Sequence, residues 1–184
     1  MRMKWIVLLA ATCLLVQPLS LPAQDVPVEK PWEATAGAMF WQGDHQDAGI
    51  ETGFMGGLDY YLRGTESAVY GVGVRGIFGS GDGTDSTTLG AHLILRGAFS
   101  QGGGAGAAMF YKVAAGLFWT EISPAVAVTA DEIGFGGSAS IGYDFSMTDG
   151  AAGTPFSIEV GWFFGPSVDG ADNNGFFALA GVRF

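Results

Sequence analysis

The chain is poor in cysteine, in charge and in long apolar runs. Its one cysteine, Cys13, lies in an apolar segment at the start, so the chain beyond it forms no disulfide and carries no thiol. After Ala23 no stretch approaches 18 consecutive apolar residues, which excludes transmembrane helices. Charged residues make up only 14% of the 184 residues, whereas hydrophobic residues reach 48%. High apolar content without apolar runs predicts strands.

Basic residues are scarce as well. The chain has 8 Lys and Arg against 18 Asp and Glu. Arg2 and Lys4 belong to the apolar start, so the rest holds six basic and 18 acidic residues, a net charge of −12. This balance excludes nucleic-acid binding, which needs basic patches.

The start of the chain has the features of a secretory signal peptide. Met1–Lys4 carries two positive charges, Trp5–Val16 is apolar, and Leu21-Pro22-Ala23 is an acceptable cleavage site. A retained anchor is the alternative, but the apolar segment is shorter than the roughly 20 residues that a membrane helix needs. We therefore expect residues 1–23 to be removed and residues 24–31 to form a short periplasmic lead.

The last ten residues, Gly175–Phe184, alternate strictly. Phe176, Ala178, Ala180, Val182 and Phe184 share one face, and Arg183 shares the other with Gly181. An apolar face ending on an aromatic residue resembles the C-terminal assembly signal of outer-membrane barrels, with Phe176, Val182 and Phe184 as its key positions. The resemblance implies insertion by the outer-membrane assembly machinery.

Seven further segments alternate in the same way, separated by turn-rich sequence. Their lengths suit tilted membrane strands of about 9–11 residues. The eight predicted strands are Trp32–Gln42, Thr52–Arg63, Val69–Gly79, Thr88–Phe99, Ala107–Glu121, Ile133–Ser146, Pro155–Gly165 and Gly175–Phe184.

Aromatic residues gather at both ends of the outward faces. One end carries Trp32, Tyr60, Tyr70, Phe99, Tyr111, Tyr143, Phe156 and Phe184, and the other carries Phe40, Phe54, Phe78, Trp119, Phe135, Phe164 and Phe176. Two aromatic belts around an apolar band are typical of a membrane barrel. A soluble sandwich has no reason to sort its aromatic residues in this way.

The charged residues of the strands fall on the inward faces. The inward bases are Arg75, Arg96, Lys112 and Arg183, the inward acids are Glu33, Asp59, Asp144 and Glu159, and His92 lies beside them. An eight-stranded barrel leaves room only for side chains, and charges buried there need partners. We therefore predict a structural network of ion pairs across the lumen, with partners left open, and not an acid–base catalytic site.

By strand count and pattern, residues 32–184 resemble the small eight-stranded outer-membrane barrels of the OmpA/OmpX type. The resemblance implies an all-β, antiparallel up-and-down transmembrane barrel in the bacterial outer membrane, preceded by a cleaved signal peptide. It also implies contact with outer-membrane lipid and lipopolysaccharide.

Four connections should face outward: Gly43–Glu51, Ser80–Thr87, Ile122–Glu132 and Pro166–Asn174. They contain nine acidic residues and no Lys or Arg, which favours a solvated, turn-forming rim. A second interpretation is calcium binding at Ser80–Asp85 and Asp169–Asn174, although neither segment has the spacing of an EF-hand.

An enzyme is the main alternative to a binding or structural role. Lipid A palmitoyltransferases carry a His in the first outer loop and an Asp-Ser pair in the second, to which His45 and Asp85-Ser86 are similar. A lipid A deacylase needs a lipid-facing His, whereas His92 points inward. No other catalytic motif, transition-metal site or cofactor is expected. We expect a non-enzymatic barrel that serves envelope integrity or surface contact, with a lipid A acyltransferase or a narrow channel as alternatives.

Overall fold

The computed structural model describes residues 28–47, 49–64, 68–99, 108–124, 128–146 and 155–184. The predicted signal peptide, residues 24–27 of the lead and the inner turns at 100–106 and 147–154 lie outside these ranges.

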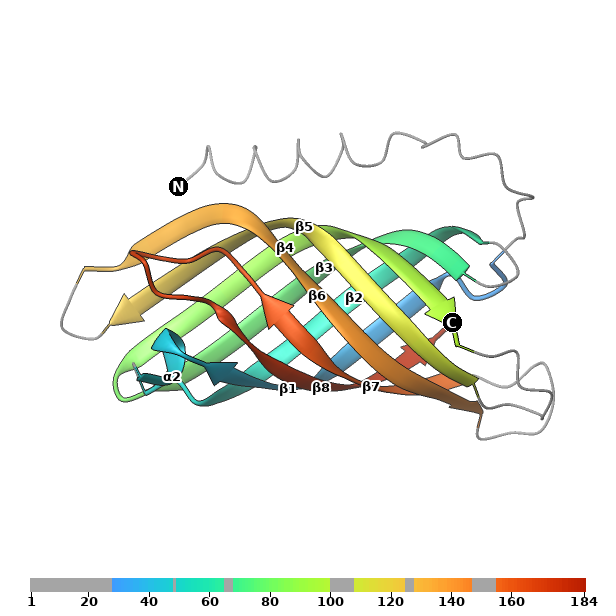
Figure 1. Cartoon of the computed structure of the whole chain (residues 1–184), viewed down its shortest axis with the longest axis horizontal. Helices are drawn as coiled ribbons and strands as arrows, with labels where there is room; N and C mark the ends of the chain where they lie inside the picture. Colours follow the sequence, from blue (N-terminus) through green and yellow to red (C-terminus); the bar gives the residue numbers. More distant parts are fainter. Residues whose placement is uncertain (1–27, 48, 65–67, 100–107, 125–127, 147–154) are drawn as a thin grey trace.

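The eight predicted strands are confirmed and close into an antiparallel up-and-down barrel (Figure 1). Each strand pairs with its neighbours in the chain, and β1 pairs with β8. The strands are β1 (Trp32–Gln42), β2 (Thr52–Gly64), β3 (Ala68–Gly81), β4 (Thr84–Ala98), β5 (Ala108–Pro124), β6 (Ala130–Ser146), β7 (Pro155–Phe164) and β8 (Asn174–Arg183). A short helix, α2 (Asp44–Asp47), lies at the end of the barrel opposite the C-terminus.

The paired residues give the stagger of the barrel. Starting at Trp32 on β1 and stepping through the partners on β2 to β8, the path returns to β1 at Gln42, ten positions further on. Such a stagger tilts eight strands by about 40° from the axis and leaves an interior that side chains fill.

This stagger brings the outward aromatic residues to two levels. Residues at one level are offset by just over one position from strand to strand, which aligns Trp32 with Tyr143 and Phe40 with Phe135. The two levels lie about eight residues apart, or roughly 20 Å along the axis. Large apolar side chains between them face outward, including Val74, Val113, Ile141, Ile158 and Val160. The two aromatic belts therefore bound an apolar band.

The prediction for the second outer connection is wrong. Ser80–Thr87 is not a loop, because β3 continues to Gly81 and β4 begins at Thr84. Asp82 and Gly83 alone form the turn, with φ of 45° and 76°. Positive φ at both central residues is the type I′ geometry, which matches the twist of the flanking strands and favours Asp-Gly.

The third outer connection is also shorter than expected. Instead of spanning Ile122–Glu132, it is confined to residues between Pro124 and Ala130, because β5 and β6 both run further outward. In contrast, β7 ends at Phe164 and β8 begins at Asn174, both close to the outer aromatic belt. The sheet therefore projects past the belt on one side only.

The inward side chains are sorted by level. The outermost layer is polar and includes Ser86, Thr88, Thr120 and Asn173, all buried. Charged side chains occupy the half of the lumen nearest the C-terminus. Between the two lies an apolar layer of Met39, Trp41, Ile50, Met55, Ile77, Phe118, Phe163, Phe177 and Leu179.

Candidate functional site

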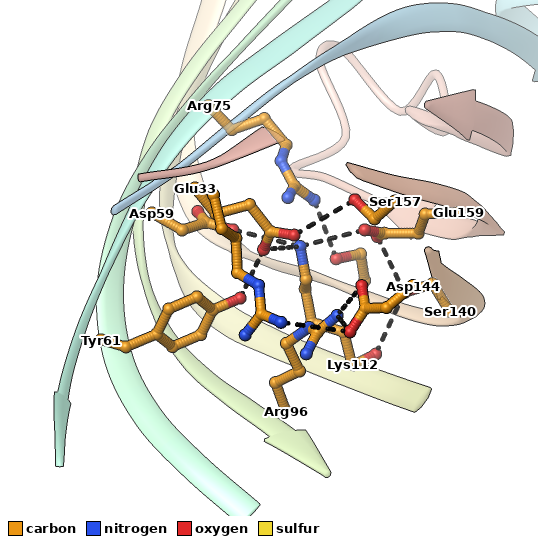
Figure 2. A network of polar contacts seen from close by, with 12 residues as sticks. Glu33, Asp59, Tyr61, Arg75, Arg96, Lys112, Ser140, Asp144, Ser157 and Glu159 are labelled. Atoms are coloured by element: carbon orange, nitrogen blue, oxygen red, sulfur yellow. Dashed lines mark hydrogen bonds and ion pairs between the residues drawn. The ribbon is translucent and has the colours of Figure 1, made fainter. Parts of the chain in front are cut away.

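Lys112 of β5 lies at the centre of the charged layer and is 1% exposed. Its Nζ lies 3.0 Å from Glu33 Oε2, 3.2 Å from Asp59 Oδ2 and 2.9 Å from Glu159 Oε2 (Figure 2). An ammonium group has three donors, so three carboxylates match its capacity. These carboxylates come from β1, β2 and β7, and one side chain therefore joins four strands.

The carboxylates around Lys112 have further partners. Tyr61 Oη donates to Glu33 Oε2, and Ser157 Oγ donates to Glu33 Oε1 over 3.3 Å. Ser140 Oγ donates to Glu159 Oε1 over 2.8 Å, and His92 Nε2 lies 3.2 Å from Asp59 Oδ1. Hydrogen bonds of this kind satisfy lone pairs that a buried carboxylate would otherwise leave unpaired.

A second group lies nearer the inner mouth and is centred on Asp144 of β6. Arg96 Nη2 donates to both oxygens of Asp144, over 2.6 and 2.7 Å, and Arg183 Nη2 lies 3.3 Å from Oδ2. The Arg96 guanidinium also stacks over Phe110, 3.7 Å from the ring centre. Two cations share one carboxylate here, whereas one cation shares three carboxylates at Lys112, so the two groups have opposite local charge.

Arg75 and His92 mark the border between the charged and apolar layers. Arg75 forms no ion pair with a carboxylate of the described residues; its Nη1 donates to Ser138 Oγ over 3.0 Å. Its guanidinium lies 5.9 Å from the Phe177 ring centre, and the His92 ring stacks on Phe118 at 6.2 Å. Both side chains therefore contact aromatic rings of the apolar layer.

Asn173 closes the outer end of the lumen. Its Oδ1 accepts from Trp41 Nε1 over 3.1 Å, and its Nδ2 donates to Thr88 Oγ1 over 3.0 Å and to Thr120 Oγ1 over 2.9 Å. These partners come from β1, β4 and β5. The connection between β7 and β8 therefore folds inward and is fastened across the barrel.

His45 of α2 fastens the first outer connection to the same place. Its Nδ1 lies 2.9 Å from the carbonyl oxygen of Asp172, and its Nε2 lies 3.3 Å from Ser86 Oγ. A carbonyl only accepts, so Nδ1 carries the proton and Nε2 accepts from Ser86. Burial lowers the pKa of His45 from its ordinary 6.5, against the smaller opposing effects of the Asp172 carbonyl and the Asp44 carboxylate. The imidazole is therefore neutral near pH 7.

Of the three residues in the acyltransferase interpretation, the structure brings His45 and Ser86 together and places Asp85 apart. His45 and Ser86 share a hydrogen bond, whereas the Asp85 side chain is exposed on the other face of β4. Ser86 is 2% exposed and His45 is 1% exposed, so neither reaches solvent. The pair ties α2 to β4 and lies beneath the outer connections.

The two calcium-like segments differ from cation loops. Residues 80–85 are the ends of two strands and their tight turn. Residues 169–174 belong to a loop with a bridge between Val168 and Ala171 and then enter β8. Over the described ranges, no group of three or more His, Cys, Asp or Glu side chains is placed to hold a metal ion. No helix there is long and apolar enough to cross a membrane.

The nine residues predicted for the lumen all point inward. Glu33, Asp59, His92, Lys112 and Glu159 form one group, Arg96, Asp144 and Arg183 form the second, and Arg75 stands apart. Of the predicted assembly signal, Phe176 and Phe184 are exposed on the outside. Phe184 exchanges two backbone hydrogen bonds with Trp32, of 3.0 and 3.1 Å, and so helps to close the barrel.

Sequence reasoning missed two residues. Tyr61 lies two residues after Asp59 on β2 and therefore faces the same side of the strand, so alternation alone would have placed it inside the barrel. Asn173 lies just before β8 in a connection expected to face solvent, and no local signal marks it as buried.

A closed eight-stranded barrel with two aromatic belts and a filled lumen has the fold of the small outer-membrane barrels. The fold is similar to the crystal structure of Neisserial surface protein A (NspA), with a TM-score of 0.64 over 83% of this chain and 93% of that one. Ail, the attachment invasion locus protein of Yersinia pestis, gives a TM-score of 0.48 over 85% of this chain and all of its own. Its complex with the heparin analogue sucrose octasulfate gives 0.42 over 84% and 97%.

Each of these structures is 12% identical to this chain, so the likeness shows the fold alone. No family model matches the chain. No curated protein matches it either.

Proposed function

We propose that this protein is a non-enzymatic outer-membrane barrel, closed to ion flow, that presents a projecting β-sheet for contact at the bacterial surface. One observation carries the proposal: β4, β5 and β6 continue past the outer aromatic belt, whereas β7 and β8 end at it. Short loops are enough to connect the strands of a barrel that only spans the membrane. The extra strand length therefore serves a role outside the lipid.

The projecting sheet has an edge that no strand covers. β7 pairs with β6 only from Gly137 inward. Gly165 and Pro166 lie beside Gly136 and Gly134, and within the described ranges no strand pairs with that side of Glu132 and Ile133. Val128, just before β6, is 89% exposed. A strand edge of this kind accepts an extended polypeptide through backbone hydrogen bonds. An extended segment of another protein is therefore the partner that this surface fits.

The lumen supports a role without conduction. Ions entering from outside meet the buried Asn173 and then the apolar layer around Phe118 and Phe177, which carries no charge. Below it the charged side chains other than Arg75 are paired with one another. The paired residues thus have a structural role and hold the strands together; they are Lys112, Glu33, Asp59, Glu159, Arg96, Asp144 and Arg183.

The proposed location is supported by the export-signal features of residues 1–23, the alternation of the C-terminal strand and the aromatic belts. Residues 1–23 direct export, residues 24–31 lead into β1 from the periplasm, and the C-terminal strand with Phe184 is read by the assembly machinery. The apolar band then contacts outer-membrane lipid and lipopolysaccharide.

Surface labelling tests the orientation. Val128→Cys should react with a membrane-impermeant maleimide on intact cells, whereas Leu62→Cys, 49% exposed near the inner end of β2, should react only after permeabilisation. Band shift on boiling checks folding of both variants. Labelling of Leu62→Cys on intact cells, or of neither variant, contradicts the proposal.

A shortened hairpin tests the role. Joining Glu121 to Asp131, its partner on β6, through Asn-Gly removes the projecting tip and leaves the belt residues and the register in place. Cells carrying this variant should lose most of their adhesion to a surface coated with casein, an extended polypeptide, at equal expression. Equal adhesion of both strains contradicts a contact role and leaves the location untouched.

A further inference from the structure

A depression runs along the lipid-facing side of β6, β7, β8 and β1. Its outer half, of about 610 Å³, reaches the outer aromatic belt at Phe40, Trp162 and Phe176. Its inner half, of about 500 Å³, reaches Tyr143. The two halves share lining residues and form one continuous groove across the apolar band.

Small side chains make its floor. Ala178 is paired with Ala38 on one side and Val160 on the other, and Ala180 is paired with Ala36. Larger side chains flank this floor, including Ile141 and Ile158. At the outer end Trp162 and Phe176 pack edge to face with ring centres 4.5 Å apart, so the groove opens beside an aromatic pair at the headgroup level.

We infer that the outer half of this groove binds one acyl chain of a lipopolysaccharide molecule. This inference rests on the outer-membrane location proposed above, which makes lipopolysaccharide the lipid of the outer leaflet. The groove lies between the aromatic belts and is lined almost wholly by apolar side chains, so its occupant is hydrocarbon. A flexible chain follows a narrow groove and restores the dispersion contacts that an unfilled hollow loses.

A second copy of the protein does not fit the same surface. Two-fold association places identical patches against each other, so the hollow over Ala178 would face the hollow of the partner. The space enclosed between them would have no atoms to fill it, which is unfavourable for packing.

The groove recognises the acyl chain of lipopolysaccharide and not its phosphate groups. The four outward connections contain no Lys or Arg, so they offer no direct salt bridge to a phosphorylated headgroup. Binding should therefore depend on the shape of the groove and change little with ionic strength.

Filling the groove tests the inference. Ala178→Phe occupies the floor, and Ala115→Phe is the matched control, since Ala115 is exposed on β5 at the same depth but outside the groove. The barrels are purified from outer membranes in mild detergent and examined by native mass spectrometry. Wild type and Ala115→Phe should carry one lipopolysaccharide, and Ala178→Phe should retain about tenfold less, comparable to the burial lost for two methylene groups.

The outcomes separate this inference from the proposed location. Equal lipid on all three barrels, a bound glycerophospholipid or a dimer without lipid overturns it while leaving an outer-membrane barrel. Recovery of the wild type in another cell fraction overturns the location instead. If Ala178→Phe lacks the band shift on boiling, Ala139→Leu replaces it, because Ala139 lines the same half of the groove.

Discussion

Lys112 Nζ lies 2.9 Å from Glu159 Oε2, and this contact joins β5 to β7 through the middle of the barrel. The same ammonium group holds Glu33 and Asp59, so removing it leaves three buried carboxylates with excess negative charge. A buried charge that loses its partner is unfavourable by several kcal/mol, whereas an intact network holds strands in register. Removing Lys112 alone should therefore destabilise the barrel.

Lys112→Met should lower the free energy of unfolding by about 3–5 kcal/mol, because it leaves the three carboxylates without their cation. Urea unfolding of the barrel in lipid vesicles measures the change. Adding Glu33→Gln and Glu159→Gln to the variant should restore part of the loss. Equal stability of Lys112→Met and wild type would show that the network contributes little.

Planar-bilayer recordings should show no steady conductance for the wild type, nor for Glu159→Ala, since the apolar layer still blocks the path. Phe118→Ala combined with Phe177→Ala opens that layer and should produce discrete current steps. Steps in Glu159→Ala alone would instead identify the charged layer as the constriction of a narrow channel.

Asn173→Ala should loosen the outer end without unfolding the barrel. Three hydrogen bonds to Trp41, Thr88 and Thr120 are lost, worth roughly 2–4 kcal/mol together. Hydrogen exchange should rise at residues 165–173 and stay unchanged at the inner ends of the strands. Asn174→Ala, one position along, is the control, and equal exchange in both variants contradicts the fastening role.

Acid should loosen the same end through His45. Well above pH 6.5 its ring is neutral in both folded and unfolded chains, so it adds no pH dependence there. Below pH 6.5 the unfolded chain takes up a proton that the folded chain resists, because burial lowers the pKa of His45 in the fold. The free energy of opening should therefore fall between pH 7 and pH 5.

Limited proteolysis of the outer connections at these two pH values measures the effect. His45→Gln keeps a polar side chain without titration, and Asp44 and Asp172 remain in both proteins. An equal increase in cleavage of His45→Gln and wild type at pH 5 would assign the effect to the carboxylates.

Ser86 should not react with a fluorophosphonate probe in the folded barrel, because its hydroxyl is buried. Ser86→Ala provides the background signal. Labelling of wild type above that background, together with altered lipid A in cells, would revive acyl transfer.

Local pattern accounts for much of this structure. On β6 the alternation of Ile133, Phe135 and Ile141 with glycine and serine predicts both faces of the strand. Parity likewise places Lys112 and Glu159 inside, since successive side chains of a strand point to opposite sides. The predicted loop Ser80–Thr87 is longer than the observed turn at Asp82-Gly83, although Asp-Gly between alternating residues is a hairpin signal.

The amino-acid sequence by itself determined the strand count, the two faces of each strand and the aromatic belts, because these depend on a period of two residues within one segment. Only the tertiary structure decided that Glu33 meets Lys112, that Asn173 turns inward, and that β4 to β6 project. These features depend on the stagger between strands, which is set by the closure of the whole sheet and is not encoded in any one segment.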